Sequence, residues 1–298
     1  MKKKIIYELN ALYREPMQVM GYVFGEGEKS VCVVGSMRGN EVQQMFSCSC
    51  LIRRLKKLEE RQELAAGKSI LVIPCINSYS MNIGKRFWST DNTDINRMFP
   101  GYQEGETTQR VAAGVFDAVK DYGIGIQFAS NYMSGRFLPH IRMMRTGFED
   151  IEAAKNFAFP YVMVRDTRPF DTTTLNYNWQ IWETKAYSVY TTDTEEIDRQ
   201  SAADAVKGIE KMLNAEGVLN SRVSGGYHYH SQVLGDDSLL SVRCMEAGIY
   251  ENKVYVGEEV HEGQLLAEIT DPYEGTVLEQ LTAPADATVF FQHKAPLI

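Results

Sequence analysis

Residues 30–41 read Ser-Val-Cys-Val-Val-Gly-Ser-Met-Arg-Gly-Asn-Glu, a β-branched run that leads into a glycine-containing loop. After this loop, apolar residues recur every three or four positions from Val42 to Leu58, which is the pattern of an amphipathic helix. A second apolar run, Ser69 to Pro74, follows that helix and predicts another buried strand. Strand, loop, helix and strand in this order are typical of a parallel sheet with helices against its faces.

The same alternation continues to about residue 213. Helices are expected over residues 107–120, 149–156, 174–184 and 201–213, and strands over 124–128, 161–164 and 187–191. The runs Met17–Phe24 and Ser30–Ser36 are separated by Gly-Glu-Gly-Glu-Lys, which predicts a hairpin at the start of the sheet. In α/β sheets ligands bind beyond the carboxyl ends of strands, so the loops there are the candidate sites.

The pattern changes after about residue 222. Residues 244–298 hold short β-rich runs divided by glycine and proline, with no helical period of useful length. We therefore expect an α/β domain over residues 1–222, with a mostly parallel sheet flanked by helices, and an all-β domain over residues 223–298.

Composition and charge narrow the class of protein. The chain has 298 residues, of which 44% are hydrophobic and 23% charged, as in folded globular proteins of about two domains. Its formal net charge of −8 argues against a nucleic-acid partner, because phosphate backbones attract cations. The one basic cluster, residues 53–57, is followed at once by glutamates and is predicted to be a solvated helix face.

Cysteine spacing and hydropathy bear on location. Five cysteines, an odd number without CxxC spacing, favour reduced thiols in a cytoplasmic protein. No apolar run approaches the ~20 residues that a membrane-spanning helix needs, so no membrane partner is expected.

Two strand-end loops stand out: Gly35–Glu41, and residues 94–101, which read Asp-Ile-Asn-Arg-Met-Phe-Pro-Gly. With the run Leu138-Pro-His-Ile-Arg142 and the glycine-punctuated β domain, they resemble the succinylglutamate desuccinylase and aspartoacylase family, relatives of the zinc carboxypeptidases. The resemblance covers most of the chain. It implies a zinc-carboxypeptidase-like α/β fold with a barrel-sandwich-like β domain, and a zinc-dependent hydrolase of N-acyl amides that bear a small carboxylate.

The zinc ligands of that family are only partly matched. Its first loop reads Gly-x-His-Gly-Asp/Asn-Glu, which aligns Glu41 with a ligand and Arg38 with the first His. A guanidinium has no lone pair to give to zinc. The second His, in an Asp-Leu-His-Thr pattern, aligns with Ala129, and His140 is the candidate for a displaced ligand. The general-base Glu has no clear match, which leaves Asp193 and Glu195 as substitutes.

The part of the family site that holds the substrate carboxylate is better matched. Asn96, Arg97 and the upstream Arg86 align with those positions, and Arg38 is a further candidate for anion binding. A planar guanidinium suits a carboxylate because it donates two parallel hydrogen bonds. The resemblance therefore implies a small carboxylate-bearing substrate or ligand.

Glu41 has three interpretations. It is a zinc ligand, a helix-start carboxylate that favours the positive end of the helix dipole, or the partner of Arg38 in an ion pair that replaces the charge of zinc. Two functions follow, a hydrolase with an atypical metal site and a metal-free relative that binds a small carboxylate or peptide end. The sequence also leaves open whether the β domain covers its own pocket or contacts a second copy in a homo-oligomer.

Overall fold

The computed structural model describes residues 1–12 and 15–298. Its largest element is a sheet of nine strands. In spatial order these are β1 (Lys2–Leu9), β2 (Met17–Gly25), β4 (Gly67–Cys75), β3 (Gly27–Ser36), β5 (Ile124–Ala129), β9 (Lys185–Tyr190), β7 (His140–Arg145), β8 (Tyr161–Asp166) and β10 (Gln232–Leu234).

The centre of this sheet is parallel. Strands β4, β3, β5 and β9 pair parallel, as do β7, β8 and β10 with one another. The β7–β9 pair and the edge formed by β1 and β2 are antiparallel. The expected mixed, mostly parallel sheet flanked by helices is therefore confirmed.

The prediction of a hairpin at the start of the sheet is wrong, because β2 and β3 do not pair with each other. Strand β4 lies between β2 and β3 and pairs with both. The glycine turn joining β2 to β3 accommodates the start of β4, because a Cβ on Gly27 (φ +132°) would lie 2.2 Å from the carbonyl oxygen of Gly67. β3 is apolar on both faces, so it gains more by pairing on both sides with buried strands.

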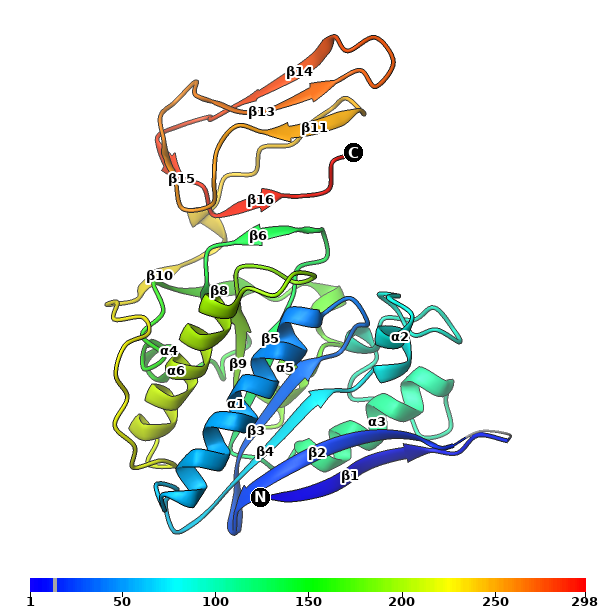
Figure 1. The fold of residues 1–298 in the computed structure, drawn as a ribbon, viewed down its shortest axis with the longest axis vertical. Helices are drawn as coiled ribbons and strands as arrows, with labels where there is room; N and C mark the ends of the chain where they lie inside the picture. The colour runs from blue at the N-terminus through cyan, green and yellow to red at the C-terminus, as the bar shows by residue number, and fades with distance from the viewer. Residues whose placement is uncertain (13–14) are drawn as a thin grey trace.

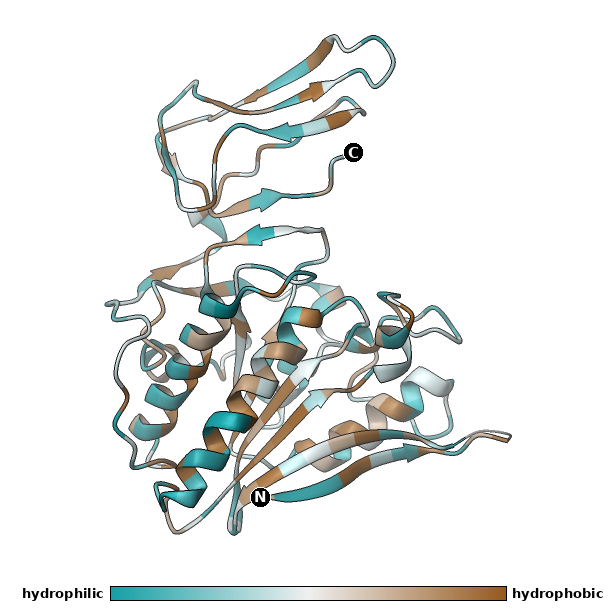
Figure 2. Ribbon diagram, viewed as in Figure 1, coloured by the Kyte–Doolittle hydropathy of each residue, from teal (hydrophilic) through white to brown (hydrophobic). Residues whose placement is uncertain are grey.

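Helices cover both faces of the sheet (Figure 1). The helices α1 (Val42–Glu60), α4 (Ile151–Lys155) and α6 (Arg199–Ala215) pack on one face, with Val31 and Val33 of β3. The helices α3 (Thr107–Val119) and α5 (Leu175–Ile181) pack on the other face, with Cys32 and Val34. Alternate residues of one strand thus enter opposite cores. Figure 2 shows the apolar colour on the central strands and the polar colour on the outer turns of α1 and α6.

The length and hydropathy of the helices determine whether any of them could cross a membrane. In residues 1–12 and 15–298, none of them has the length and apolar character that crossing a bilayer requires.

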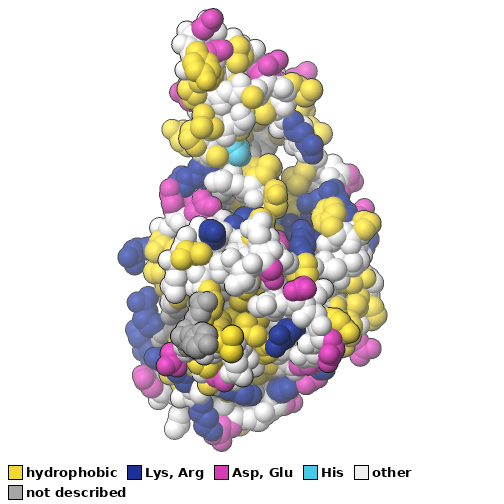
Figure 3. All heavy atoms as spheres, turned by 90° about the vertical axis from the view of Figure 1, so that its right-hand side faces the viewer, with side chains coloured by type: hydrophobic (Ala, Val, Ile, Leu, Met, Phe, Trp, Pro, Cys, Tyr) yellow, Lys and Arg dark blue, Asp and Glu magenta, His cyan; other side chains and the backbone are white. Residues whose placement is uncertain are grey.

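The C-terminal residues form a narrower β unit that stands on the α/β body (Figures 1 and 3). Its small antiparallel sheets pair β11 (Ile249–Asn252), β13 (Leu265–Thr270) and β14 (Val277–Thr282), and β12 (Glu259–Val260) with β15 (Ala287–Thr288). A last strand, β16 (Phe291–His293), pairs with β6 (Gly135–Phe137) of the α/β body. Since β10 belongs to the large sheet, that sheet continues past residue 222, and the domain boundary at that residue stays a prediction.

Candidate active site

The loop after β3 folds around a buried carboxylate. β3 ends at Ser36, and the chain turns back before α1 begins at Val42. Glu41 lies inside this turn, where its Oε2 accepts hydrogen bonds from the backbone N–H of Met37 at 2.7 Å and of Arg38 at 3.0 Å. The turn also requires Gly39, because a Cβ there would lie 2.1 Å from the carbonyl oxygen of Lys85. The backbone of the sequence Met-Arg-Gly-Asn-Glu therefore holds the carboxylate in place.

Arg38 lies at the centre of a buried ion cluster, which comprises Arg38, Glu41, Asp94 and Ser130. Its Nη1 donates to Glu41 Oε1 at 2.8 Å, and its Nε and Nη2 donate to Asp94 at 3.0 and 2.9 Å. The residue is only 6% exposed. Burial alone lowers the pKa of the guanidinium, but the two carboxylates outweigh it and hold the pKa above its usual value. Arg38 is therefore a permanent cation between two carboxylates.

Two further segments complete the cluster. Asp94 precedes the short helix η1 (Ile95–Arg97), and its Oδ1 also accepts the backbone N–H of Asn96 at 3.1 Å. Ser130 directly follows β5, and its hydroxyl donates to Glu41 Oε1 at 2.5 Å. The residue before it, Ala129, contributes a methyl group and no ligand atom. Loops after three different strands thus meet at one point.

His140 begins β7 at the same edge of the sheet, opposite Tyr190. Its ring stacks on the Tyr190 ring with centroids 4.5 Å apart and planes 9° apart. Its Nδ1 is 2.8 Å from the carbonyl oxygen of Leu138, so Nδ1 carries the proton in this hydrogen bond. Burial lowers the pKa of His140 to about 3. The imidazole is therefore neutral at physiological pH.

Three predicted anion-binding residues lie in different surroundings. Arg97 donates to the carbonyl oxygen of Phe170 at 2.5 Å and is 3.5 Å from a carboxylate oxygen of Asp171, so its charge is already paired. Asn96 accepts from the backbone N–H of Leu175 at 3.2 Å. Arg86 makes no ion pair with any of the residues that the structure describes. Of the three, Arg86 has the cation most available to a ligand.

Arg86 is nevertheless held in place. Its Nη2 donates to the carbonyl oxygen of Asn131 at 3.2 Å, and its guanidinium lies 5.2 Å from the Tyr132 ring centroid and 5.7 Å from that of Phe87. Its Nε is buried without a hydrogen-bond partner. Burial and the nearby Arg38 charge lower the pKa of Arg86. An unpaired, half-buried guanidinium beside the ion cluster is suited to donate hydrogen bonds to an anion.

The two candidates for the general base have structural partners instead. Asp193 is buried, and its Oδ2 is 3.2 Å from Nζ of Lys294 in the C-terminal β unit. Burial raises the pKa of Asp193. The hydrogen bonds from backbone N–H groups and the contact with Lys294 lower it by more, so the net pKa lies below the usual value. Glu195 is exposed and accepts from Asn40 Nδ2 at 2.8 Å. The assignment of a base to either residue stays a prediction.

Comparisons with known proteins decide the family. A model of the succinylglutamate desuccinylase/aspartoacylase catalytic domain matches residues 27–213, well over half of the chain. This chain belongs to that family. An N-alpha-acetyl-L-2,4-diaminobutyric acid deacetylase of Halomonas elongata is 24% identical over 263 residues, which cover 83% of this chain and 72% of the relative.

Solved structures of the family share the fold. A succinylglutamate desuccinylase/aspartoacylase from Rhodobacter sphaeroides matches with a TM-score of 0.81 and 20% identity, over 99% of this chain and 92% of the other. The product-bound ectoine utilization protein EutE (DoeB) from Ruegeria pomeroyi matches with a TM-score of 0.79 and 18% identity, over 98% and 90%. Both likenesses run through the C-terminal β unit as well as the catalytic domain.

The zinc that this family implies does not fit the residues present in this member. Zinc needs lone pairs from three protein ligands in a catalytic site, and Arg38 has none. Both oxygens of Glu41 are already engaged, one by two backbone N–H groups and the other by Arg38 and Ser130. Within the described part of the chain, no three His, Cys, Asp or Glu side chains are arranged to hold a metal ion.

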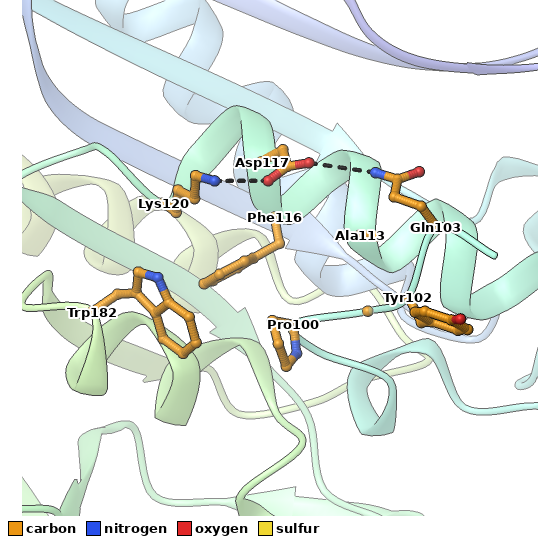
Figure 4. A pocket seen from close by; sticks show the side chains of 9 residues that line it. Pro100, Tyr102, Gln103, Ala113, Phe116, Asp117, Lys120 and Trp182 are labelled. Atoms are coloured by element: carbon orange, nitrogen blue, oxygen red, sulfur yellow. Dashed lines mark hydrogen bonds and ion pairs between the residues drawn. The ribbon is translucent and has the colours of Figure 1, made fainter. Parts of the chain in front are cut away.

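Two surface cavities lie away from the ion cluster. One, of about 380 Å³, is lined by α3 and by residues 100–103, and in it the rings of Phe116 and Trp182 meet edge to face at 5.3 Å (Figure 4). Its only charged side chains, Asp117 and Lys120, pair with each other at 2.8 Å. The other lies along α1 and α6 and is described below.

Sequence reasoning missed two members of the cluster. Asp94 opens the quoted Asp-Ile-Asn-Arg run and Ser130 directly follows Ala129, which was aligned with the second His, but neither was assigned a role. Their position was the available signal, because both stand in loops that follow strands or precede short helices at the same edge of the sheet. Tyr190, which pairs with Ala129 across β5 and β9, was also not assigned a role, and its place at the end of a strand was the same kind of signal.

Proposed function

We propose that this chain is a member of the family that binds a small N-acylated amino acid without zinc-dependent hydrolysis. One observation carries the proposal: the Arg38 guanidinium is held between Glu41 and Asp94 and is nearly excluded from solvent. The permanent charge of Arg38 therefore neutralises Glu41 and Asp94, as a bound zinc ion would otherwise do. The cluster is then a fixed structural element, because a guanidinium does not coordinate a water molecule and lower its pKa as zinc does.

Recognition of the ligand is assigned to Arg86. Its unpaired guanidinium faces no competing carboxylate partner, and the aromatic rings of Phe87 and Tyr132 restrict its movement. A carboxylate would accept charge-assisted hydrogen bonds from the part of this guanidinium that the protein leaves exposed. The ligand class is taken from the relative in Halomonas elongata, whose name states an N-acetylated diamino acid substrate.

Zinc-dependent hydrolysis is the second candidate. It is favoured by the match of the catalytic domain over residues 27–213. In this chain it would need Arg38 to leave both carboxylates and expose Glu41, which breaks a buried ion pair at a cost of about 3–5 kcal/mol.

The deciding experiment measures metal, binding and turnover on one preparation. Protein purified without added metal is analysed for zinc, titrated calorimetrically with N-acetyl-L-2,4-diaminobutyrate and N-succinyl-L-glutamate, and assayed for release of free amine. We expect less than one zinc in ten chains, saturable binding of at least one of the two compounds, and no amine release. About one zinc per chain together with amine release would overturn the proposal in favour of hydrolysis.

Variants locate the binding. Arg86→Ala should weaken binding at least about tenfold, since it removes a charge-assisted pair of hydrogen bonds. Arg145→Ala is the matched control, because it removes a guanidinium whose pair with Asp166 is exposed. Equal binding by both variants would contradict the role of Arg86.

Variants at the ion cluster test whether Arg38 takes the place of the zinc ion. Arg38→Met leaves the buried carboxylate of Glu41 and the partly buried one of Asp94 without their cation. It should cost about 3–5 kcal/mol of unfolding free energy, whereas Arg145→Met should cost about 0–1 kcal/mol. The double change Arg38→His with Ala129→His supplies two imidazoles beside Glu41 and should create zinc binding, measured by zinc titration. A double variant that folds and takes up no zinc would contradict this account of the site.

A further inference from the structure

The second cavity lies along the seam between α1 and α6, which pack side by side on one face of the sheet (Figure 1). It has a volume of about 530 Å³, which lies within the range of small-molecule sites. Gln43 at the start of α1 donates a hydrogen bond to Asp198 at the start of α6, and further along both helices Arg54 pairs with Glu210. The two helices therefore run in the same direction. A third wall is formed by residues 222–224.

The two helices contribute matching stripes to this cavity. The lining positions of α1 are 46, 50, 53, 54 and 57, and those of α6 are 199, 203, 206, 207 and 210. Both sets have the spacing of a single helix face. At 1.5 Å per residue each stripe is about 16 Å long, so the cavity is an elongated groove. Apolar side chains such as Val206 lie among cationic ones along its length.

Six cationic side chains line the groove, against one carboxylate. The cations are Arg53, Arg54, Lys57, Arg199, Lys207 and Arg222. The carboxylate, Glu210, is already saturated: it accepts two hydrogen bonds from Arg54, at 2.6 and 2.7 Å, and a third from the Ser221 hydroxyl at 2.6 Å. It therefore has no remaining capacity to neutralise the other cations.

The other five cations make no ion pair with any residue in 1–12 or 15–298. Two of them have weak side-chain contacts with described residues. Arg53 is 3.7 Å from Sγ of Cys50, and the Arg199 guanidinium lies 5.4 Å from the Phe46 ring centroid. In a chain with a formal net charge of −8, surface carboxylates are plentiful, yet Glu210 is the single carboxylate among the residues that line this groove. Like charges gathered in a concave site repel one another and focus a positive potential on it.

We propose that the α1–α6 groove binds a small multivalent oxyanion, such as a compound with two or more phosphate groups. A single phosphate cannot reach cations spread over about 16 Å, whereas a chain of anionic groups can contact several of them. Guanidinium forks match phosphate and carboxylate oxygens alike. The groove shares no lining residue with the ion cluster or with Arg86, so this inference stands apart from the proposed function.

The test uses inorganic triphosphate, citrate and inorganic phosphate as probes in isothermal titration calorimetry of the full chain. We expect one saturable site for triphosphate, bound at least about tenfold more tightly than phosphate because more than one charge-assisted contact forms. Citrate binding as tight as that of triphosphate would identify a polycarboxylate as the preferred ligand of the same site. No saturable binding of either multivalent probe would overturn the proposal.

Charge reversals separate the groove from the overall charge of the chain. Lys57→Glu with Arg222→Glu should weaken triphosphate binding at least about tenfold. Lys56→Glu with Lys3→Glu carries the same change in net charge at exposed positions outside the groove, and should weaken binding less than about threefold. Equal losses in the two variants would overturn the assignment. Lys57→Gln with Arg222→Gln gives a milder variant if the reversal fails to fold.

Discussion

At the scale of single residues, Glu41 brings together the donors that define the site. Two backbone N–H groups of its own loop hold one oxygen, and the Arg38 guanidinium and the Ser130 hydroxyl hold the other. A carboxylate buried in this way needs a cation beside it. Arg38 supplies that charge through two geometrically matched interactions, which a lysine ammonium could not reproduce.

The ion pair of Arg38 and Glu41 was one of three interpretations open from the sequence, and the structure contains it. The three-residue spacing was sufficient to suggest this contact. The pairing of Arg38 with Asp94 could not be derived in the same way, since 56 residues separate them and only the fold brings them together. Likewise, nothing in the sequence around Arg97 indicated that Asp171 would neutralise it.

A prediction at this scale concerns the pH dependence of stability. His140 titrates at a pKa of about 3 in the folded chain because of burial, against about 6.5 in the unfolded chain. Below pH 6.5 only the unfolded state takes up the proton, so stability falls as the pH falls towards 3. Between pH 7 and pH 5 this group alone should cost about 2 kcal/mol.

Urea denaturation at both pH values measures that loss. In His140→Gln the residue cannot titrate, so the variant should lose about 2 kcal/mol less than the wild type over the same interval. The variant His228→Gln, at an exposed position, serves as the control and should follow the wild type. Parallel pH profiles of wild type and His140→Gln would contradict the burial argument.

At the scale of elements, hydrophobic period predicted most helices and central strands. The stretches expected at residues 124–128 and 161–164 fall within β5 and β8, and the stretch at 187–191 overlaps β9 except for its last residue. Periodicity carries no information on which strand lies beside which, and for this reason β4 was not placed between β2 and β3. Strands β6 and β7 were not predicted, because each is short and contains polar residues. The run at residues 138–142 was used only as a family motif.

An element-scale prediction concerns the packing of α6. Gly208 lies where a Cβ would be 2.6 Å from Cε2 of Phe159 and 3.0 Å from the carbonyl oxygen of Phe157. Gly208→Ala should therefore lower the unfolding free energy by about 1–3 kcal/mol, although alanine favours a helix.

A second substitution isolates the cause of that loss. Phe159→Leu removes the ring atoms that the new Cβ would meet, so the double variant should be more stable than the sum of the two single effects. Denaturant unfolding of the four proteins gives the coupling energy. Additive effects would show that the loss does not arise from this contact.

At the scale of the whole molecule, three places in the acidic chain bring cations together or use them: the ion cluster with Arg86, the α1–α6 groove, and the junction with the C-terminal β unit. Arg38 and Arg86 lie at the sheet edge, and unpaired cations line the α1–α6 groove. The junction joins the C-terminal β unit to the α/β body through β16 and β6, with the rings of Phe137 and Phe291 4.6 Å apart. Composition predicted the two-part organisation, but the residues that join the parts lie far apart in sequence.

Asp193 is a buried polar contact of that junction. Its Oδ1 accepts three backbone N–H bonds within its own loop, and its Oδ2 faces Lys294, which is also 2.6 Å from Glu196. Lys294→Met leaves Asp193 only Arg136, an exposed side chain 3.5 Å away. We expect the unfolding free energy to fall by about 1–2 kcal/mol, between the values for exposed and buried ion pairs.

Lys253→Met is the matched control, because Lys253 also contacts two carboxylates, Glu251 and Glu268, but lies wholly within the β unit. It should lose less than about 1 kcal/mol and leave the junction intact. Limited proteolysis of residues 236–248 should accelerate in Lys294→Met alone, since this segment connects the two parts. Equal proteolysis of both variants would show that the β unit is held by the β16–β6 pairing and its aromatic rings rather than by Lys294.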